Sequence, residues 1–402
     1  MECHRSYGDD APLYKCPVCK GLLEVVYDYS KQKAGIRQKW SARPISVWRY
    51  RELLPPIDQF HIVSLGEGGT PLYPVDRIAS HLHLDELFLK NEGANPTGSF
   101  KDRGMTVGVS KAVALGMRVV ACASTGNTSA SLAAYGARAG LRCMVLVPEG
   151  KVALGKLSQA IVHGAEVVTI DGNFDQALRL VEEICRRFPV YLLNSVNPFR
   201  LEGQKTLAFE IWEQLGNVVP DAVVVPVGNA GNISALWSGF TELQQLGLTE
   251  KLPRLLGVQA EGAAPLARSF KSGRDDLTPV RNPETVATAI RIGFPVNWRK
   301  AIRALRESDG SMVIVSDHEI LSAQKLIARG EGVFVEPASA ASVAALPHFL
   351  EEDVLSSESQ VICIATGHGL KDPAAVLSTP QQKRLVAASV ESIVESFQLA
   401  GS

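Results

Sequence analysis

The sequence predicts an α/β fold with largely parallel sheets, and two observations lead to this prediction. Short apolar runs alternate with helix-like segments over most of the 402 residues, the pattern of parallel strands joined by crossover helices. Several apolar runs are followed at once by polar, glycine-rich loops, as at the carboxyl ends of strands in open α/β sheets, where ligands bind. We therefore expect a ligand site assembled from loops that lie far apart in the chain.

The expected strands are short and mostly apolar. They are 119–123, 143–147, 166–170, 191–194, 222–227, 254–259 and 361–365. The helix-like segments between and after them are 127–139, 153–162, 173–187, 203–215, 231–246, 317–329 and 338–350. No internal repeat and no low-complexity linker divides the chain, so the domain boundaries are poorly marked.

The segment from Gly93 to Asp102 is the most informative, because it places Lys101 after a polar turn broken by glycine and proline and before a helix-like run. A cation at a helix N-terminus is disfavoured, so this position favours the neutral amine. The neutral amine is the form that attacks an aldehyde to give a Schiff base, and burial lowers a lysine pKa in the same direction. On this segment alone, a solvated surface lysine remains an alternative.

Three further loops follow predicted strands. Residues 124–129 precede a helix of small residues, and Thr366 follows the strand 361–365. Residues 228–232 combine glycine and asparagine, which tolerate positive φ, so successive backbone N–H groups can converge on an anion. A plain tight turn is the alternative for this loop. A lysine, an asparagine loop, a glycine cradle and a terminal hydroxyl are together the groups that a pyridoxal-phosphate site requires.

Five motifs in order resemble the threonine synthase family of fold-type II pyridoxal-phosphate enzymes. They are 98–104 (GSFKDRG), 123–129 (ASTGNTS), 193–200 (LNSVNPFR), 226–232 (PVGNAGN) and 366–369 (TGHG). The resemblance runs from about Gly66 to Asp372 and so covers most of the chain. It implies a fold like that of the tryptophan synthase β-subunit, with two open, mostly parallel sheets flanked by helices.

The resemblance also implies the roles of the cofactor-binding residues. Lys101 would be the Schiff-base lysine and the acid/base that moves protons between substrate carbons. Asn127 would bind the ring hydroxyl of pyridoxal 5'-phosphate, and Thr366 would face the pyridine nitrogen. The cofactor phosphate would be held by the backbone of Gly228, Asn229, Ala230, Gly231 and Asn232.

The substrate implied by the resemblance is O-phospho-L-homoserine. Its phosphate needs a second anion site, and Arg200 is the first choice because a guanidinium offers a planar bidentate fork; a surface ion pair is the alternative for Arg200 alone. The neutral groups expected near the substrate are Ser124, Thr125, Thr128, Asn194, Ser195 and Asn229. The implied reaction is γ-elimination of phosphate followed by addition of water at Cβ, which makes the enzyme a carbon–oxygen lyase in the last step of threonine biosynthesis.

Two other functions remain open from the sequence. One is a related pyridoxal-phosphate lyase, such as a threonine or serine dehydratase or a cysteate synthase, which shares the lysine and the glycine cradle. The other is a catalytically silent pyridoxal-binding or zinc-ribbon regulatory protein. Arg200 distinguishes a phosphohomoserine enzyme from a dehydratase, since a dehydratase has no substrate phosphate to bind. Lys101 distinguishes an active enzyme from a catalytically silent protein, since a silent protein does not need this lysine.

Composition agrees with a small-molecule enzyme. The formal net charge is −1 and no long basic block appears, so we expect no nucleic-acid partner. No apolar span of membrane length and no signal-peptide pattern is present, so we expect a soluble cytoplasmic protein without membrane attachment, forming a homodimer.

Seven cysteines, scattered over the chain, do not suggest a disulfide framework. Cys16-Pro17-Val18-Cys19, with Cys3 upstream, is typical of half a zinc ribbon. Ser6 stands where a Cys3-x-x-Cys pair would close, so four ligands are not assured. We therefore expect no bound metal, with Cys3, Cys16 and Cys19 as weak candidates.

The domain organisation is predicted mainly from the resemblance. Residues 1–30 are expected to be a zinc-ribbon-like extension that has lost ligands, and 381–402 a C-terminal helix. A large cofactor-binding domain would comprise 31–92 and 194–380, with a small α/β domain inserted at 93–193.

Overall fold

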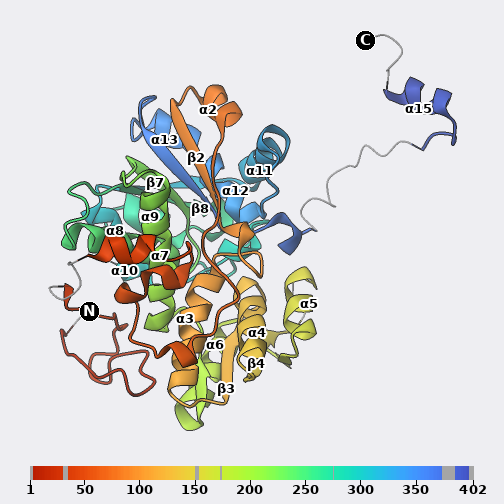
Figure 1. The fold of residues 1–402 in the computed structure, drawn as a ribbon. Coiled ribbons are helices and arrows are strands. Elements are labelled where there is room, and N and C mark those ends of the chain that lie inside the picture. Colours follow the sequence, from red (N-terminus) through yellow and green to blue (C-terminus); the bar gives the residue numbers. More distant parts are fainter. Residues whose placement is uncertain are drawn as a thin grey trace. The chain divides into compact units, whose positions relative to one another are not determined.

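The structure is a computed structural model that describes residues 3–29, 35–149, 154–172, 174–274, 276–373 and 385–397. It divides into two compact units, Met1–Asp372 and Pro373–Ser402, and the first contains both sheets (Figure 1). The α-helices are α1 (Ile36–Ser41), α2 (Asp76–Leu82), α3 (Lys101–Ala114), α4 (Asn127–Arg138), α5 (Leu154–Val162), α6 (Phe174–Arg187), α7 (Pro198–Gln214), α8 (Gly231–Gln245), α9 (Pro265–Lys271), α10 (Trp298–Glu307), α11 (Asp317–Glu331), α12 (Pro337–Ala344), α13 (Leu346–Glu351) and α15 (Val390–Phe397).

A six-stranded sheet forms one half of the first unit. In spatial order its strands are β1 (Leu72–Pro74), β2 (Glu86–Asn91), β10 (Gln360–Ala365), β7 (Ala222–Pro226), β8 (Arg254–Ala260) and β9 (Ser311–Val315). Only β1 runs antiparallel to its neighbour, and the other pairs are parallel. The chain thus brings β2 and β10, separated by most of the sequence, side by side in the sheet.

Both faces of this sheet are buried, as expected of parallel strands covered by crossover helices. Along β10, Ile362 and Ile364 pack into the hydrophobic core formed with α7, α8, α9 and α10. The alternating residues Val361 and Cys363 face the opposite core, formed with α2, α11, α12 and α13. This two-sided burial explains why β7 and β10 appear in the sequence as continuous apolar runs.

A four-stranded parallel sheet forms the other half, in the order β5 (Glu166–Ile170), β4 (Arg142–Pro148), β3 (Val119–Ala123), β6 (Val190–Leu192). One face packs against α3 and α4 through side chains such as Met105 and Leu132. The other packs against α6 through Ala177 and Val181. The two sheets confirm the predicted fold class.

Helices α3, α7 and α8 pack closely on one another, and glycines allow it. A Cβ added to Gly203 on α7 would lie 1.8 Å from the carbonyl oxygen of Arg103 on α3. A Cβ on Gly239 of α8 would lie 2.5 Å from the carbonyl oxygen of Lys205 on α7. Because side chains are absent at these points, the backbones touch, and the first turns of α3 and α7 are held at a short, defined separation.

Replacing Gly203 with alanine is expected to destabilise the protein by about 3 kcal/mol, because the new methyl group collides with backbone that cannot move aside. Gly330→Ala is the matched control: Gly330 also lies in a helix, but a Cβ there meets nothing within 4 Å. That control should be neutral or stabilising by up to about 1 kcal/mol. Urea unfolding of both variants measures the difference, and equal midpoints would contradict the close packing.

Several helix boundaries differ from the sequence expectation for local reasons. Helix α7 begins at Pro198, five residues earlier than expected, because the Asn197 side chain accepts a hydrogen bond from the Phe199 N–H, 3.0 Å away. The segment 338–350 is divided into α12 and α13. In the tail, residues 385–389 are not helical and α15 begins at Val390, while 381–384 and 398–402 lie outside the described residues.

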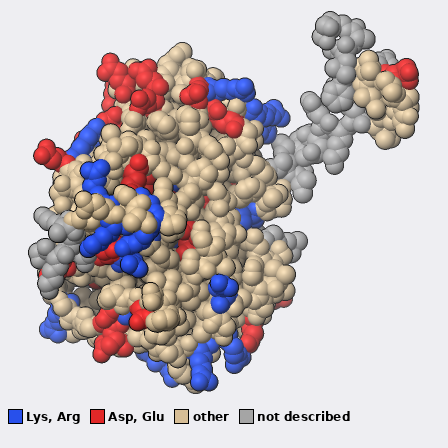
Figure 2. Space-filling model, viewed as in Figure 1, with Lys and Arg blue, Asp and Glu red and all other residues tan. Residues whose placement is uncertain are grey.

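None of the helices in the described part of the chain is both long and apolar enough to span a membrane. The face shown in Figure 2 carries both basic and acidic side chains, with uncharged surface between the charged groups.

Candidate active site

A cavity lies at the carboxyl ends of β7 and β10, where the first turns of α3, α4, α7 and α8 meet. Loops from widely separated parts of the chain contribute to it, as the sequence predicts. The lining residues are Phe100, Lys101, Asn127, Ser195, Arg200, Leu201, Gln204, Pro226, Gly228, Asn229, Ala230, Gly231, Asn232, Ile233, Ala289, Ile290 and Thr366.

Lys101 is the first residue of α3. Its Nζ lies 3.9 Å from the centroid of the Phe100 ring. Burial lowers the pKa of Lys101 from 10.5 to about 7; the positive charges of Arg200 and Lys156 act in the same direction, whereas Glu336 opposes them. A large fraction of the amine is therefore neutral near pH 7, the form that can act as a nucleophile or base.

The loop between β7 and α8 forms a cradle at the positive end of a helix. Ala230, the N-cap of α8, has φ of 62°, which turns the backbone N–H groups of the loop inward. A Cβ at Gly228 would lie 3.1 Å from the Ala289 carbonyl oxygen, so this wall has little room for a side chain. The N-terminus of a helix with a glycine-rich loop before it is a site for phosphate.

Arg200 lies in the first turn of α7 and is only 1% exposed. None of its three guanidinium nitrogens has a hydrogen-bond partner among the described residues. Burial lowers the pKa of Arg200 to about 10, which still leaves it charged at neutral pH. A buried cation without a carboxylate partner is costly in free energy, so Arg200 marks a place for an anion on the cavity wall.

Asn127, at the first position of α4, is oriented by Glu336. Its Nδ2 donates to Glu336 Oε1 at 2.9 Å and Oε2 at 3.2 Å, while its Oδ1 has no partner among the described residues. Glu336 also forms a buried ion pair with Lys156, with Nζ and Oε2 3.2 Å apart. Lys156 in turn donates to Thr288 Oγ1 at 2.8 Å.

Thr366 follows β10 directly and is 4% exposed. Its hydroxyl lies 3.0 Å from Ser339 Oγ on α12, and its carbonyl accepts from the Phe100 N–H at 3.0 Å. The second contact joins the end of β10 to the residue before Lys101. These two contacts fix Thr366 beside the start of α3.

The structure brings most of the predicted residues together but not all. Ser195 and Asn229 line the cavity, whereas Ser124, Thr125, Thr128 and Asn194 are not among its lining residues. Both ends of the Asn194 amide bind the backbone of Ala123: Oδ1 accepts from its N–H and Nδ2 donates to its carbonyl, each at 2.9 Å. Asn194 thus fastens the loop after β6 to the end of β3.

Sequence reasoning missed the charged residues that support the site. Glu336 and Lys156, both 1% exposed, are separated by 180 positions in the chain, and no short motif links them. Arg103, two residues after Lys101, is fully buried and binds Glu92 and Glu210, whose carboxylates it contacts at 2.5–2.7 Å. The one signal in the sequence is that Glu336 stands directly before Pro337, at the start of α12.

Glu336→Gln is expected to destabilise the protein by about 1–3 kcal/mol, because it leaves Lys156 with a weaker partner in a buried position. Asp372, whose Oδ2 lies 3.6 Å from Lys156 Nζ, limits the loss. Urea unfolding of Glu336→Gln, Lys156→Met and the double variant measures the pair. If the effects of the two single changes simply add, the ion pair has no coupling energy and this interpretation is wrong.

The cavity fits pyridoxal phosphate. An aldehyde needs a neutral amine, and the pKa of Lys101 provides one. A phosphate needs backbone donors at a helix N-terminus, which the cradle before α8 supplies. The side chains of Asn127 and Asn232 carry buried polar atoms without partners among the described residues, as expected where a polar ligand is to be bound.

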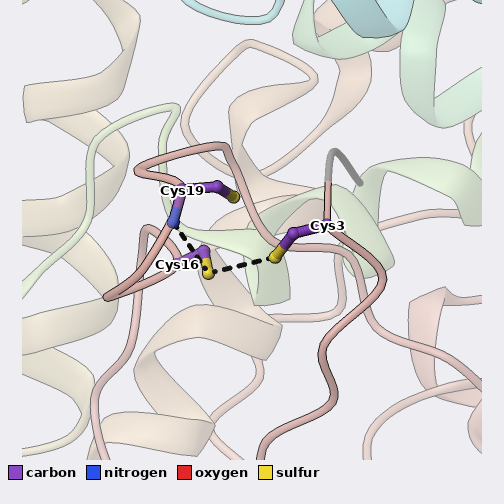
Figure 3. A group of neighbouring side chains, drawn as sticks. All are labelled: Cys3, Cys16 and Cys19. Atoms are coloured by element: carbon purple, nitrogen blue, oxygen red, sulfur yellow. Dashed lines mark hydrogen bonds between the residues drawn. The ribbon is translucent and has the colours of Figure 1, made fainter.

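The three candidate metal ligands lie apart from this cavity. Cys3, Cys16 and Cys19 come together in the N-terminal segment (Figure 3), and all seven cysteines are free thiols. Cys122, Cys143 and Cys363 are buried in strands.

Comparison with known proteins agrees with this chemistry. Residues 63–367 match the family described as pyridoxal-phosphate dependent enzyme. The chain is 56% identical to a threonine synthase of Methanocaldococcus jannaschii, covering 95% of this chain and 94% of the relative. It is 54% identical to a threonine synthase of Methanosarcina acetivorans, covering 99% and 97% of the two chains.

Among solved structures, a maize serine racemase has the same fold, with a TM-score of 0.64 and 20% identity over 82% of this chain and 92% of that one. With most of its length matched at more than half identity, the chain belongs to the threonine synthase family of pyridoxal-phosphate dependent enzymes.

Proposed function

We propose that this protein converts O-phospho-L-homoserine and water to L-threonine and phosphate. The observation that carries the proposal is that one cavity combines two separate anion sites with a lysine. One is the cradle before α8, and the other is the buried, unpartnered guanidinium of Arg200. A pyridoxal-phosphate enzyme acting on an uncharged side chain needs the first, with donors for the substrate carboxylate, but no cation for a phosphate on the side chain. The second is what a phosphorylated substrate requires.

The residues of the cavity would hold the cofactor as follows. Lys101 would bind it covalently, the backbone of Gly228 to Asn232 would hold its phosphate, and Asn127 would donate to or accept from its ring hydroxyl. Thr366 would face its pyridine nitrogen with a hydroxyl, which does not force that nitrogen to be protonated. When bound, pyridoxal phosphate supplies an electron sink that stabilises negative charge on the substrate carbons.

Two basic residues of the chain, Lys101 and Arg200, would carry out the other catalytic steps. Lys101 would take the proton from Cα and return protons later, because an amine with a pKa of about 7 can both accept and donate at neutral pH. Arg200 would bind the phosphate of the substrate with its bidentate fork and neutralise the charge that grows on it as it leaves. Ser195 and Asn229 would add neutral donors on the same wall.

The test is to incubate the purified protein with phosphohomoserine and pyridoxal phosphate and to measure threonine and released phosphate together. The proposal requires the two in equal amounts. Threonine or serine as the only substrate, with 2-oxo acid and ammonia as products, would identify a dehydratase instead. Phosphate release without threonine would contradict the water-addition step.

The pH dependence of cofactor uptake should reflect the pKa of Lys101. Since the protonated amine cannot attack an aldehyde, uptake of pyridoxal phosphate by the apoprotein should accelerate as pH rises through about 7 and level off above it. Stopped-flow absorbance of the bound cofactor gives the midpoint. Glu336→Gln should shift that midpoint downward, because Glu336 raises the pKa of Lys101. A midpoint near the ordinary lysine value of 10.5 would contradict the burial effect.

We further propose that the protein works in the cytoplasm as a homodimer, with residues 93–193 as a small domain inserted between 31–92 and 194–380. Seven free cysteines favour a reducing compartment, and the four-stranded sheet, formed within residues 119–192, supports the division into domains. Light scattering of the purified holoenzyme measures the mass in solution, and a monomer would contradict the assembly.

A further inference from the structure

Three thiols converge in the N-terminal segment, at a place that the catalytic cavity does not use. The Sγ atoms of Cys3 and Cys16 lie 3.6 Å apart, and the ligand atoms of Cys3, Cys16 and Cys19 all lie within 4.8 Å of one another (Figure 3). Cys16 is 3% exposed, and the other two are partly buried. The sulfur atoms are too far apart for a disulfide, whose S–S bond is about 2 Å.

The turn from Cys16 to Gly21 has the geometry that presents two thiolates to one ion. The Cys16 N–H donates to the Gly21 carbonyl at 2.8 Å, and the Lys20 N–H donates to the Cys16 carbonyl at 3.0 Å. Lys20 has a positive φ of 62°, which reverses the chain. The Cys19 N–H points at Cys16 Sγ from 3.5 Å, so the backbone stabilises negative charge on that sulfur.

We propose that Cys3, Cys16 and Cys19 bind one zinc ion, with solvent as the fourth ligand. Thiolates are soft ligands that select Zn²⁺, and Zn–S bonds of 2.3 Å in a tetrahedron place sulfur atoms about 3.8 Å apart. The 3.6 Å between Cys3 and Cys16 already matches this spacing. Among the described residues, no fourth cysteine, histidine or carboxylate joins the group.

The surroundings of the three thiols also suit a bound zinc ion. The Tyr7 hydroxyl lies 3.1 Å from Cys16 Sγ and can donate to it when the sulfur is a thiolate. Hydrogen bonds to the sulfur ligands are the outer contacts that orient a metal site. The sequence expectation of no bound metal rested on the missing fourth ligand at Ser6. Under the proposal, solvent takes that position beside the three preplaced thiols.

A bound zinc ion would stabilise the folded protein, because the N-terminal segment that carries the three cysteines contacts the rest of the catalytic unit at several points. Asp9 forms an ion pair with Lys111 of α3 at 2.7 Å. The Tyr14 hydroxyl accepts from the Leu192 N–H at 2.8 Å, and Lys300 of α10 donates to the Leu23 carbonyl at 2.8 Å. A zinc ion would close the loop from Cys3 to Cys16 and so hold these contacts in place.

The experiment measures zinc in the full-length, untagged holoenzyme by inductively coupled plasma mass spectrometry. We expect about one zinc per chain in the wild type and in Cys185→Ser, the matched control, whose cysteine is free, partly buried and outside the cluster. Cys19→Ser should lose most of the metal and unfold at a lower temperature, while the visible absorbance of its bound cofactor stays unchanged.

A second measurement does not depend on a variant that folds. Wild-type chain freed of zinc and loaded with Co²⁺ should show the sulfur-to-cobalt charge-transfer band of a thiolate site, and its thiols should react more slowly with a disulfide reagent than without metal. Absence of both zinc and this band would overturn the proposal. So would zinc retained by Cys19→Ser at the wild-type level, or a Cys3–Cys16 disulfide found by mass spectrometry in the protein as purified.

Discussion

Lys101→Ala should lower kcat/KM for phosphohomoserine by roughly 10³-fold or more, because the same amine would hold the cofactor and move every proton. Among the described residues that line the cavity, Lys101 is the one lysine. Lys156 is buried too, but its Nζ is engaged with Glu336 and Thr288. The measurement is steady-state release of phosphate and threonine, with borohydride reduction and peptide mapping to find the lysine that carries the cofactor.

Lys101→Arg is the control for charge, and it should be as inactive as Lys101→Ala because a guanidinium cannot form the covalent bond. Lys101→Ala should fold, since removing a buried amine relieves its desolvation cost, and circular dichroism checks the fold of Lys101→Arg, which buries a permanent charge instead. If Lys101→Ala kept more than about a tenth of the activity, or if borohydride labelled Lys156 in the wild type, the assignment of Lys101 would be wrong.

Arg200→Met should affect activity and stability in opposite directions. Loss of two charge-assisted hydrogen bonds to the substrate phosphate should cost about 3 kcal/mol, roughly a hundredfold in kcat/KM. The free protein, however, should gain about 1–3 kcal/mol in its free energy of unfolding, because an uncompensated buried charge is replaced by an apolar side chain of similar length. Urea unfolding without ligand and initial rates with phosphohomoserine measure the two effects.

Arg200→Lys separates charge from geometry. It keeps the cation but loses the planar fork, so its activity should lie between those of the wild type and Arg200→Met. Added inorganic phosphate should stabilise the wild-type holoenzyme, in which the cofactor already fills the cradle before α8, and leave the Arg200→Met holoenzyme unaffected. If Arg200→Met were less stable than the wild type in the absence of anions, Arg200 would be a structural residue and the second anion site would lie elsewhere.

The sequence was sufficient to locate the centre of the site, because its residues stand at strand ends. The loop from Gly228 to Asn232 and Thr366 follow apolar strands at their carboxyl edges, and Lys101 follows a polar, glycine-containing turn. Parallel strands bring such edges together. The cofactor follows from these groups and agrees with the family to which the chain belongs. The individual residue roles remain predictions until the variants are measured.

The supporting residues could not be predicted in this way, because their partners come from the tertiary fold. Glu336 meets Asn127 only because α12 and α4 approach the same edge. Likewise, Arg103 neutralises Glu92 and Glu210, the latter more than 100 positions away. Burial opposes the charged form of Glu210, yet Arg103 and Lys90 lower its pKa to about 2. Such pairs have no periodicity or spacing in the sequence.

Three strands were not predicted from the sequence: β1, β2 and β9. Strand β9 is an apolar run, and the absence of β1 and β2 from the prediction has a different cause. Strand β1 has only three residues and is half exposed, and β2 contains Glu86, Lys90 and Asn91, so neither forms an apolar run. Strand β2 is nevertheless central, because Lys90 is buried and binds Glu210 at 3.0 Å. A buried strand can therefore contain charged residues when their partners lie on other elements. Such a strand does not appear in the sequence as an apolar run.

The crossing of α3 and α7 at Gly203 has a consequence for substrate choice. Lys101 begins one of these helices and Arg200 lies near the start of the other, so their separation depends on touching main chains rather than on adjustable side chains. A relative that favours a substrate longer or shorter by one methylene could not change this span by single substitutions at the crossing. Such divergence would have to arise at other residues that line the cavity, such as Ala289 and Ile290.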